Sequence, residues 1–307
     1  MDHPHYVYSP LPQRAPLAWP DGARLAFCVM LHIEHWELQP PADAHRDPRF
    51  LGDFGSFNPD YGTWGQREYG NRVGIFRVLE ALDQHGIRAS VALNSSAAGR
   101  YPQLLRECGA RGYEFVGHGS HATRMLTSDM SEDQERVFIG AALDTLERAT
   151  GTRPRGWLGQ DYGESQRTPR LLAEAGLDYV ADWPNDDQPY ALNVGRPLIA
   201  LPAQPEWDDV QLLWLRRIAM RRYPDIVDEA FDTLHNEGGR VFCLGLHPWM
   251  IGQAHRVKYL RSALERICAR PQVWQATAGE IVDWTRNLAM DQRNTDLRRS
   301  EAAAPRR

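Results

Sequence analysis

The 307-residue sequence lacks several features that would define whole classes of protein. No apolar run comes near the roughly 20 residues that span a bilayer, and the start, MDHPHYVYSPLPQR, has no apolar segment of the kind found in secretory signals. The four cysteines are scattered, without the paired spacing typical of a disulfide framework or a zinc knot. These absences predict a cytoplasmic protein with reduced thiols and no membrane association.

An excess of positive charge is also missing. Forty acidic residues outnumber 35 basic ones, and the formal net charge of −5 argues against a nucleic-acid binder that depends on bulk positive charge. Hydrophobic residues make up 42% of the chain, which is typical of a globular protein with a core. Because no internal repeat and no composition break marks a linker, we expect a single domain over residues 1–292.

Short apolar segments alternate with amphipathic ones along most of the chain. The run RLAFCVMLHI is typical of a strand buried on both faces of a parallel sheet. Repeated strand-then-helix order implies parallel pairing, and it predicts an irregular (β/α) barrel of seven or eight strands, with a doubly wound sheet as the alternative. Strands are expected at 24–33, 88–93, 113–117, 179–182, 198–201, 241–246 and 273–276, and helices at 71–85, 101–111, 169–175, 224–235, 255–269 and 279–288, with another beginning at 131.

Two segments fall outside this alternation. Residues 39–70 are rich in proline, glycine, aspartate and aromatic residues. Because this insertion is too long for a simple connection, we expect it to form a lid or a wall of the functional site. Residues 293–307 are charged and rich in alanine, and they predict a disordered tail.

Histidines directly follow three of the predicted strands. The first strand leads into His32 and Glu34, which share a face because side chains alternate along a strand. Two later strands lead into His118 and His247. The carboxyl ends of parallel strands meet at the edge where such folds keep their sites, so we expect one joint site. A lone histidine after a strand is more often a capped or solvent-facing residue, and we expect His121 to be such a bystander.

These segments resemble the polysaccharide deacetylase superfamily, in the branch of the metal-independent allantoinases and related cyclic-imide hydrolases. The resemblance covers about residues 15–290 and rests on PDGARLAFCVMLHIEHWE, YEFVGHGSH, NDDQPY and HPWMIGQAHR, among other segments. It implies the irregular barrel of that superfamily and a hydrolase of carbon–nitrogen bonds other than peptide bonds. It also implies a small-molecule substrate and, because members of this branch tend to assemble, a homo-oligomer.

The metal-binding pattern of the superfamily is incomplete here. Metal-dependent members carry two aspartates after the first strand and a His-x-x-x-His motif after a later one. Glu34 stands at the second acidic position, and Ala122 stands where the second histidine would be, one residue after His121. Zinc in a catalytic site usually takes about three protein ligands. We therefore expect either no metal or a weakly bound divalent ion, zinc being possible, on Glu34 and His118 with His121 or the insertion as the third ligand.

The resemblance implies the ring opening of a cyclic amide, imide or ureide. Glu34 is our candidate for the general base, or for a metal ligand if an ion is present. The resemblance implies that His247 is the general acid, and an ordinary histidine pKa of about 6.5 suits that role near neutrality. His118 is then expected either to bind the ion or to donate a hydrogen bond to the oxyanion.

Planar and polar side chains are expected to orient a flat ring that has N–H and C=O edges. Arg256 is expected to support the site by pairing with an acidic residue, and His32 to support it from the first strand. For the two aspartates of the NDD run the alternative is a solvated turn. The predicted substrate-binding residues are Trp157, Tyr162, Asn185, Asp186 and Asp187.

Two other functions stay open on the sequence alone. A metal-dependent N-deacetylase of N-acetylated sugars would hold an ion and bind several sugar rings in an extended groove. A catalytically inactive barrel could instead persist as a binding protein. The intact segment around His247, beside a matching NDD run, argues against that last function.

Overall fold

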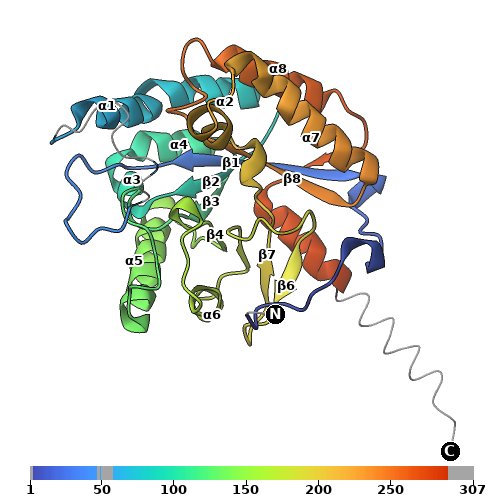
Figure 1. Ribbon diagram of the computed structural model, residues 1–307, viewed down its shortest axis with the longest axis horizontal. Coiled ribbons are helices and arrows are strands. Elements are labelled where there is room, and N and C mark those ends of the chain that lie inside the picture. Colours follow the sequence, from blue (N-terminus) through green and yellow to red (C-terminus); the bar gives the residue numbers. More distant parts are fainter. Residues whose placement is uncertain (1–2, 47–48, 50–57, 290–307) are drawn as a thin grey trace, which may run out of the picture.

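The computed structural model describes residues 3–46, 49 and 58–289 (Figure 1). In this part of the chain one nine-stranded sheet has the order β6-β7-β5-β4-β3-β2-β1-β8, and β9 pairs with β1. The strands are β1 (Leu25–Ile33), β2 (Ser90–Leu93), β3 (Glu114–Gly117), β4 (Gly156–Trp157), β5 (Tyr179–Val180), β6 (Tyr190–Leu192), β7 (Leu198–Ala200), β8 (Arg240–Leu246) and β9 (Val273–Gln275).

Helices surround the sheet, as Figure 1 shows for α2, α4, α5, α7 and α8. The chain is also helical from residue 278 to the last described residue, 289. The α-helices with printed bounds are α1 (Tyr61–Tyr69), α2 (Ile75–Asp83), α3 (Ser95–Arg100), α4 (Pro102–Ala110), α5 (Glu132–Thr150), α6 (Thr168–Glu174), α7 (Tyr223–Glu237) and α8 (Val257–Cys268).

The strand order confirms the barrel-type fold and rules out the doubly wound alternative. Strands β1 to β5 are neighbours in sequence order, and β8 returns to the free side of β1, as in a barrel. All pairs are parallel except β6 with β7, which are antiparallel. On the other side of β8, two irregular segments take the place of a neighbouring strand. The segment before β6 contacts β8 through the hydrogen bond from Val241 N to the Asp187 carbonyl, and the segment after β7 through the bond from Trp207 Nε1 to the Cys243 carbonyl.

Strand β1 lies at the centre of the molecule and is buried along all nine residues, as its apolar run predicts. Its side chains alternate between two cores. Odd-numbered residues from Leu25 to Ile33 pack against the helices, and even-numbered residues from Ala26 to Met30 pack inside the barrel with residues of the other strands. His32 and Glu34 continue the even-numbered series, so the pleat directs both side chains toward the barrel interior.

The predicted insertion is shorter than residues 39–70, because residues 61–70 are helical. Helix α1 begins after Asp60, whose carboxylate caps Thr63 N, and it continues through a π-helical turn at Gly70–Gly74 into α2. A Cβ at Gly70 would lie 2.5 Å from Trp249 N, and one at Gly74 would lie 2.2 Å from the Pro248 carbonyl oxygen. These glycines therefore permit close packing against the loop after β8.

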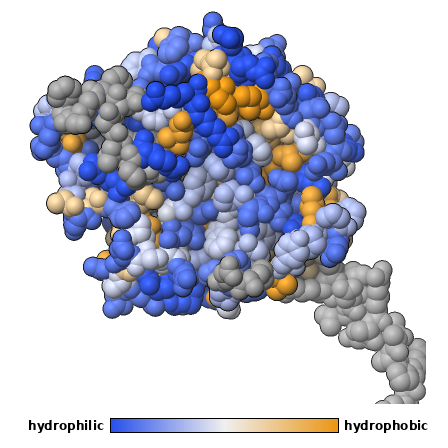
Figure 2. Space-filling view, in the orientation of Figure 1, coloured by the Kyte–Doolittle hydropathy of each residue, from blue (hydrophilic) through white to orange (hydrophobic). Residues whose placement is uncertain are grey.

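Other short elements were not predicted from the sequence, namely α3, β4 and β6. The predicted helix from residue 131 is α5, and the Ser131–Gln134 capping box is formed. The predicted tail, 293–307, lies outside the described residues, as do 47–48 and 50–57 of the insertion. Most of the face in Figure 2 is hydrophilic, and none of the described helices is both long and apolar enough to cross a membrane.

Candidate active site

The structure brings four of the predicted residues together at the carboxyl ends of β1, β3 and β8. His118 Nε2 lies 3.5 Å from Glu34 Oε1. The His32 ring stacks on the His247 ring at a centroid distance of 3.9 Å and meets the His118 ring edge-on at 5.1 Å. Ligand atoms of His32, Glu34 and His247 all lie within 4.8 Å of one another. One carboxylate and three imidazoles therefore share a single space.

Glu34 is held in place from several sides. Gln160 Nε2 donates to Glu34 Oε1 at 2.9 Å, Trp36 Nε1 donates to Oε2 at 3.4 Å, and Asn71 donates to the backbone carbonyl of Glu34. Burial by itself would raise the pKa of the carboxyl, but His118 and the neighbouring imidazoles outweigh it and lower the pKa below its usual range. The carboxylate is therefore ionised at neutral pH.

His118 presents a lone pair to this carboxylate. Its Nδ1 lies 2.5 Å from the Leu158 carbonyl oxygen, which only accepts, so Nδ1 carries the hydrogen. In the neutral ring Nε2 is then an acceptor, and it is buried without a hydrogen-bond partner among the described residues. In that neutral form two acceptors, Nε2 and Glu34 Oε1, face each other and need a hydrogen donor or a cation between them. In the protonated form Nε2 itself donates to Glu34, and this is the hydrogen bond that lowers the pKa of the glutamate.

His247 is backed by two aspartates that the sequence reading missed. Its Nδ1 donates to Asp209 Oδ1 at 2.7 Å, and its backbone N donates to Asp209 Oδ2 at 2.9 Å. Asp208 Oδ2 lies 3.6 Å from the same Nδ1. Burial alone would lower the pKa of His247, but the charges of Asp208 and Asp209 raise it to about 10. The imidazole is therefore held protonated, with Nδ1 occupied.

Aromatic and amide side chains complete a cleft that opens to solvent. Tyr162, predicted to bind substrate, is among its walls, next to Asp161. Both residues have positive φ, 51° for Asp161 and 59° for Tyr162, so the backbone is strained where it borders the cleft. Besides the four residues above, the walls include Trp36, Gln160, Asp208, Gln211 and Trp249.

Helix α1 supports the tryptophan wall, so the second half of the predicted insertion does border the site. Arg67 is 2% exposed, and its guanidinium lies 3.2 Å from the ring centroid of Trp249 and 4.6 Å from that of Trp36. Cation–π contacts of this kind fix the two indoles relative to each other. The prediction of a site wall is thus met by α1 residues, which lie close to Glu34.

Other predicted substrate-binding residues lie elsewhere. Trp157 is fully buried in the core between β4 and α5, and a Cβ at Gly117 would lie 2.7 Å from its ring. The NDD run forms a turn at the sheet edge, where Asp186 pairs with Arg14 at 2.6 Å and accepts the backbone N–H of Asp187. Asn185 accepts the Tyr190 hydroxyl. Trp157, Asn185, Asp186 and Asp187 are therefore structural, and the turn alternative holds for the aspartates.

His121 and Arg256 both lie outside the cleft, which agrees with the expectation that His121 is a bystander and not with its alternative role as a third ligand. His121 Nε2 lies 3.9 Å from Glu37 Oε1, its ring lies 5.3 Å from that of His35, and it is not among the residues that line the cleft. It does not complete a ligand set with Glu34. Arg256 donates to the Met250 carbonyl at 3.3 Å and to the Met250 sulfur. Burial lowers the pKa of Arg256 and the charge of Asp209 acts in the opposite direction, so the expected support from an acidic residue is electrostatic and not a close ion pair.

The residues of the cleft fit a weakly held divalent ion better than a tightly held one. Ligand atoms on zinc are about 2.0–2.2 Å from the metal, so two neighbouring ligands lie about 3.4 Å apart, close to the 3.5 Å between His118 Nε2 and Glu34 Oε1. The unpartnered His118 Nε2 is the atom such an ion would satisfy. His32 and His247 each place a ring nitrogen within 4.8 Å of a Glu34 oxygen and could supply a third donor, His247 through Nε2 because its Nδ1 is bonded to Asp209.

Comparisons with known proteins agree with this geometry. A family model for polysaccharide deacetylases matches residues 68–180, a segment that includes His118 and Gln160. The structure is similar to that of PuuE allantoinase, with 26% identity and a TM-score of 0.78 over 89% of this chain and 94% of that chain. It is equally similar to a probable polysaccharide deacetylase from Pseudomonas aeruginosa PAO1, with 25% identity and a TM-score of 0.78 over 89% and 95% of the two chains.

A search of curated proteins found no match. The family model and the solved structures nevertheless agree on fold and on family. They support the resemblance stated on the sequence: residues 68–180 match the polysaccharide deacetylase model, and the chain shares its fold with the two solved structures.

Proposed function

We propose that the chain hydrolyses the C–N bond of a cyclic amide, imide or ureide. The observation that carries this proposal is the pairing, within one small cleft, of the ionised Glu34 with the protonated His247. Ring opening needs a base for the attacking water and an acid for the leaving nitrogen. The similarity to an allantoinase and the aromatic and amide side chains that line the cleft support the choice of substrate class.

Glu34 and His118 are placed to bind and orient the attacking water. A water molecule between Glu34 Oε1 and His118 Nε2 would donate one hydrogen to each acceptor, and its oxygen would keep a lone pair for the carbonyl carbon. Attack transfers one proton of this water to Glu34. Of the two roles considered for His118, the hydrogen bond from Nδ1 to Leu158 favours an acceptor or ligand at Nε2 over an oxyanion donor.

His247 is placed to protonate the leaving nitrogen. Since Asp209 holds Nδ1, the proton that can reach substrate is the one on Nε2. When the tetrahedral intermediate collapses, the C–N bond breaks and the nitrogen takes this proton, and solvent exchange afterwards restores both residues. His32 stacks on the His247 ring and limits its rotation. The tryptophan and tyrosine walls would hold a flat ring and exclude other water.

A divalent ion, if bound, would lie on Glu34 and His118 and would supply polarisation of the carbonyl. The polysaccharide deacetylase model and this donor pair favour a second candidate, metal-dependent N-deacetylation of acetylated sugars. The two candidates differ in what they need. A polymer requires an extended groove, whereas Trp36, Trp249 and Tyr162 close in on the cleft from several sides.

A substrate panel tests the proposal. Allantoin, hydantoin, succinimide and acetylated sugar oligomers are incubated with the purified chain, untreated, after a chelator, and after chelator with zinc returned. We expect turnover of at least one cyclic compound and most of that activity to survive the chelator. Hydrolysis confined to acetylated sugars, lost with the chelator and restored by zinc, would replace this proposal with the second candidate.

A further inference from the structure

Asp208 lines the cleft, and only one of its carboxylate oxygens is used to hold it in place. Oδ1 accepts the backbone N–H groups of Val210 at 2.8 Å and Gln211 at 3.2 Å. This pattern is an Asx-type turn at the start of the helical segment Gln211–Leu215, and it fixes the direction of the side chain. The other oxygen, Oδ2, is therefore held in a set position.

Asp208 is one of the residues that line the cleft together with His247, and its Oδ2 lies between Gly245 and the His247 ring. It lies 3.6 Å from His247 Nδ1, beyond hydrogen-bond distance, and the proton on that nitrogen goes to Asp209 instead. Gly245 makes this position possible, because a Cβ there would lie 2.1 Å from Asp208 Oδ2. The residue is 6% exposed, so a carboxylate oxygen with spare acceptor capacity is kept in a largely desolvated place.

The neighbouring Asp209 behaves differently. Both of its oxygens accept hydrogen bonds from His247, one from the ring and one from the backbone. It is fully buried and is not among the residues that line the cleft. Asp209 therefore positions His247, whereas Asp208 meets the cleft with an acceptor still available.

We propose that Asp208 determines specificity by accepting a hydrogen bond from a ring N–H adjacent to the scissile C–N bond. The inference rests on the proposed function and narrows its substrate class to imides and ureides that carry a free N–H beside the reacting carbonyl. A site built to accept an N–H discriminates strongly against an analogue that lacks it, because the buried acceptor is then left unpaired. An N-methyl group would also occupy the space that the hydrogen bond needs.

Paired ligands test this directly. Binding of hydantoin and of its N-methyl derivatives to the chain is measured by calorimetry, and turnover of the same compounds is measured separately. We expect the native chain to prefer the N–H ring over at least one N-methyl ring by about 10–100-fold in Kd, the range of one hydrogen bond to a charged group. In Asp208→Asn the acceptor becomes a donor, and this preference should shrink to about twofold or less.

Two further variants keep the test decisive. Asp208→Ser retains an oxygen that can accept the turn N–H groups but removes Oδ2, so it should lose the preference even if the asparagine variant folds poorly. Asp186→Asn, the same chemical change at the sheet edge, should keep the native ratio. An unchanged ratio in both Asp208 variants, or a native chain that binds both rings equally or neither, overturns the inference. Selective binding without turnover would instead count against the proposed reaction.

Discussion

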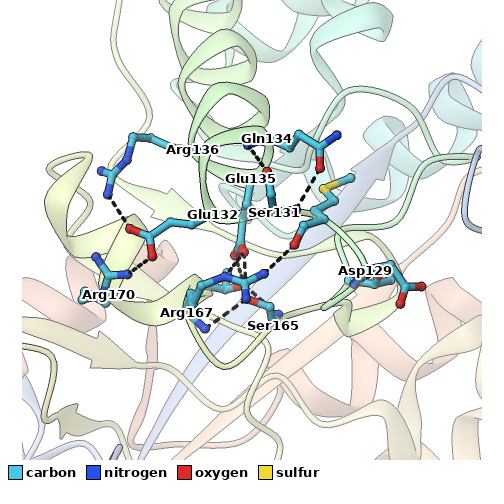
Figure 3. A network of polar contacts seen from close by, with 12 residues as sticks. Asp129, Ser131, Glu132, Gln134, Glu135, Arg136, Ser165, Arg167 and Arg170 are labelled. Carbon is cyan, nitrogen blue, oxygen red and sulfur yellow. Dashed lines mark hydrogen bonds and ion pairs between the residues drawn. The ribbon is translucent and has the colours of Figure 1, made fainter.

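Two buried glutamates, Glu34 and Glu135, have very different surroundings. Glu135, in the first turn of α5, is fully buried and accepts hydrogen bonds from Ser165 Oγ at 2.8 Å and Thr168 Oγ1 at 2.5 Å (Figure 3). Arg167 adds an ion pair at 3.2 Å. Two hydroxyls and one guanidinium thus compensate the buried charge, and the network joins α5 to the start of α6.

Glu34 is 6% exposed, but its compensation is of another kind. It receives one amide hydrogen bond from Gln160 and one indole hydrogen bond from Trp36, and it lies 3.5 Å from the His118 ring. It also borders the cleft, which Glu135 does not. The difference shows that burial alone does not mark a reactive carboxylate: a fully bonded one stabilises the fold, whereas one with remaining acceptor capacity at a cleft can take part in chemistry.

The largest effect should come from Glu34→Gln. The substitution keeps shape and volume but removes the base, or a metal ligand, so kcat/KM should fall by about 10²–10⁴-fold. The melting temperature should change little, because the substitution removes both the cost of burying the charge and the attraction between that charge and its partners. Steady-state kinetics and thermal unfolding on the same preparation measure both. Activity within threefold of the native chain would mean that Glu34 is as structural as Glu135.

Asp209→Asn should have the next largest effect. The amide cannot stabilise a charged imidazole as a carboxylate does, so kcat should fall by about 10–10²-fold while KM changes little. Asp209→Glu, which restores the charge, should recover part of the loss. If both variants lose activity only in proportion to the folded fraction seen by circular dichroism, Asp209 acts on the fold and not on His247.

Glu135→Gln should show the opposite signature to Glu34→Gln. Removing the charge weakens three bonds at once, and we expect the free energy of unfolding to fall by about 1–3 kcal/mol. In the folded fraction kcat/KM should stay within about threefold of the native value, since none of the network's acidic residues lines the cleft. Urea denaturation with activity assays at low denaturant measures both. A hundredfold loss of activity at unchanged stability would contradict the comparison.

Much of the fold and the central cleft residues follow from local patterns. The alternation of β1 places His32 and Glu34 on the interior face, and parallel pairing brings the ends of β3 and β8 to the same edge. That argument needs no knowledge of loops. It therefore predicted the convergence of Glu34, His118 and His247 as well as the positions of most strands.

The sequence could not tell which of two acidic runs meets the cleft. Asp186-Asp187 and Asp208-Asp209 are similar in composition, but the first pair binds Arg14 and the sheet edge, and the second lies beside His247. The choice depends on how the chain fills the space between β7 and β8, which is set by long-range packing. The same limit explains why Trp157 was predicted to bind substrate. It is an aromatic residue at a strand end, but its ring packs in the core.

The smallest effect should come from His121→Ala. Glu37, its acidic neighbour, is already paired with Arg124 and bonded by the Thr123 hydroxyl at 2.6 Å, so loss of the imidazole leaves no unpaired charge. We expect kcat/KM and the affinity for added zinc to change by less than about twofold. His118→Ala, the matched control, should reduce both, because it removes the lone pair that faces Glu34. Equal losses of kcat/KM and zinc affinity in the two variants would mean that His121 binds the ion. The His121–Glu37 pair would then belong with Glu34, whose acceptor capacity is available, and not with Glu135, whose oxygens are fully hydrogen-bonded.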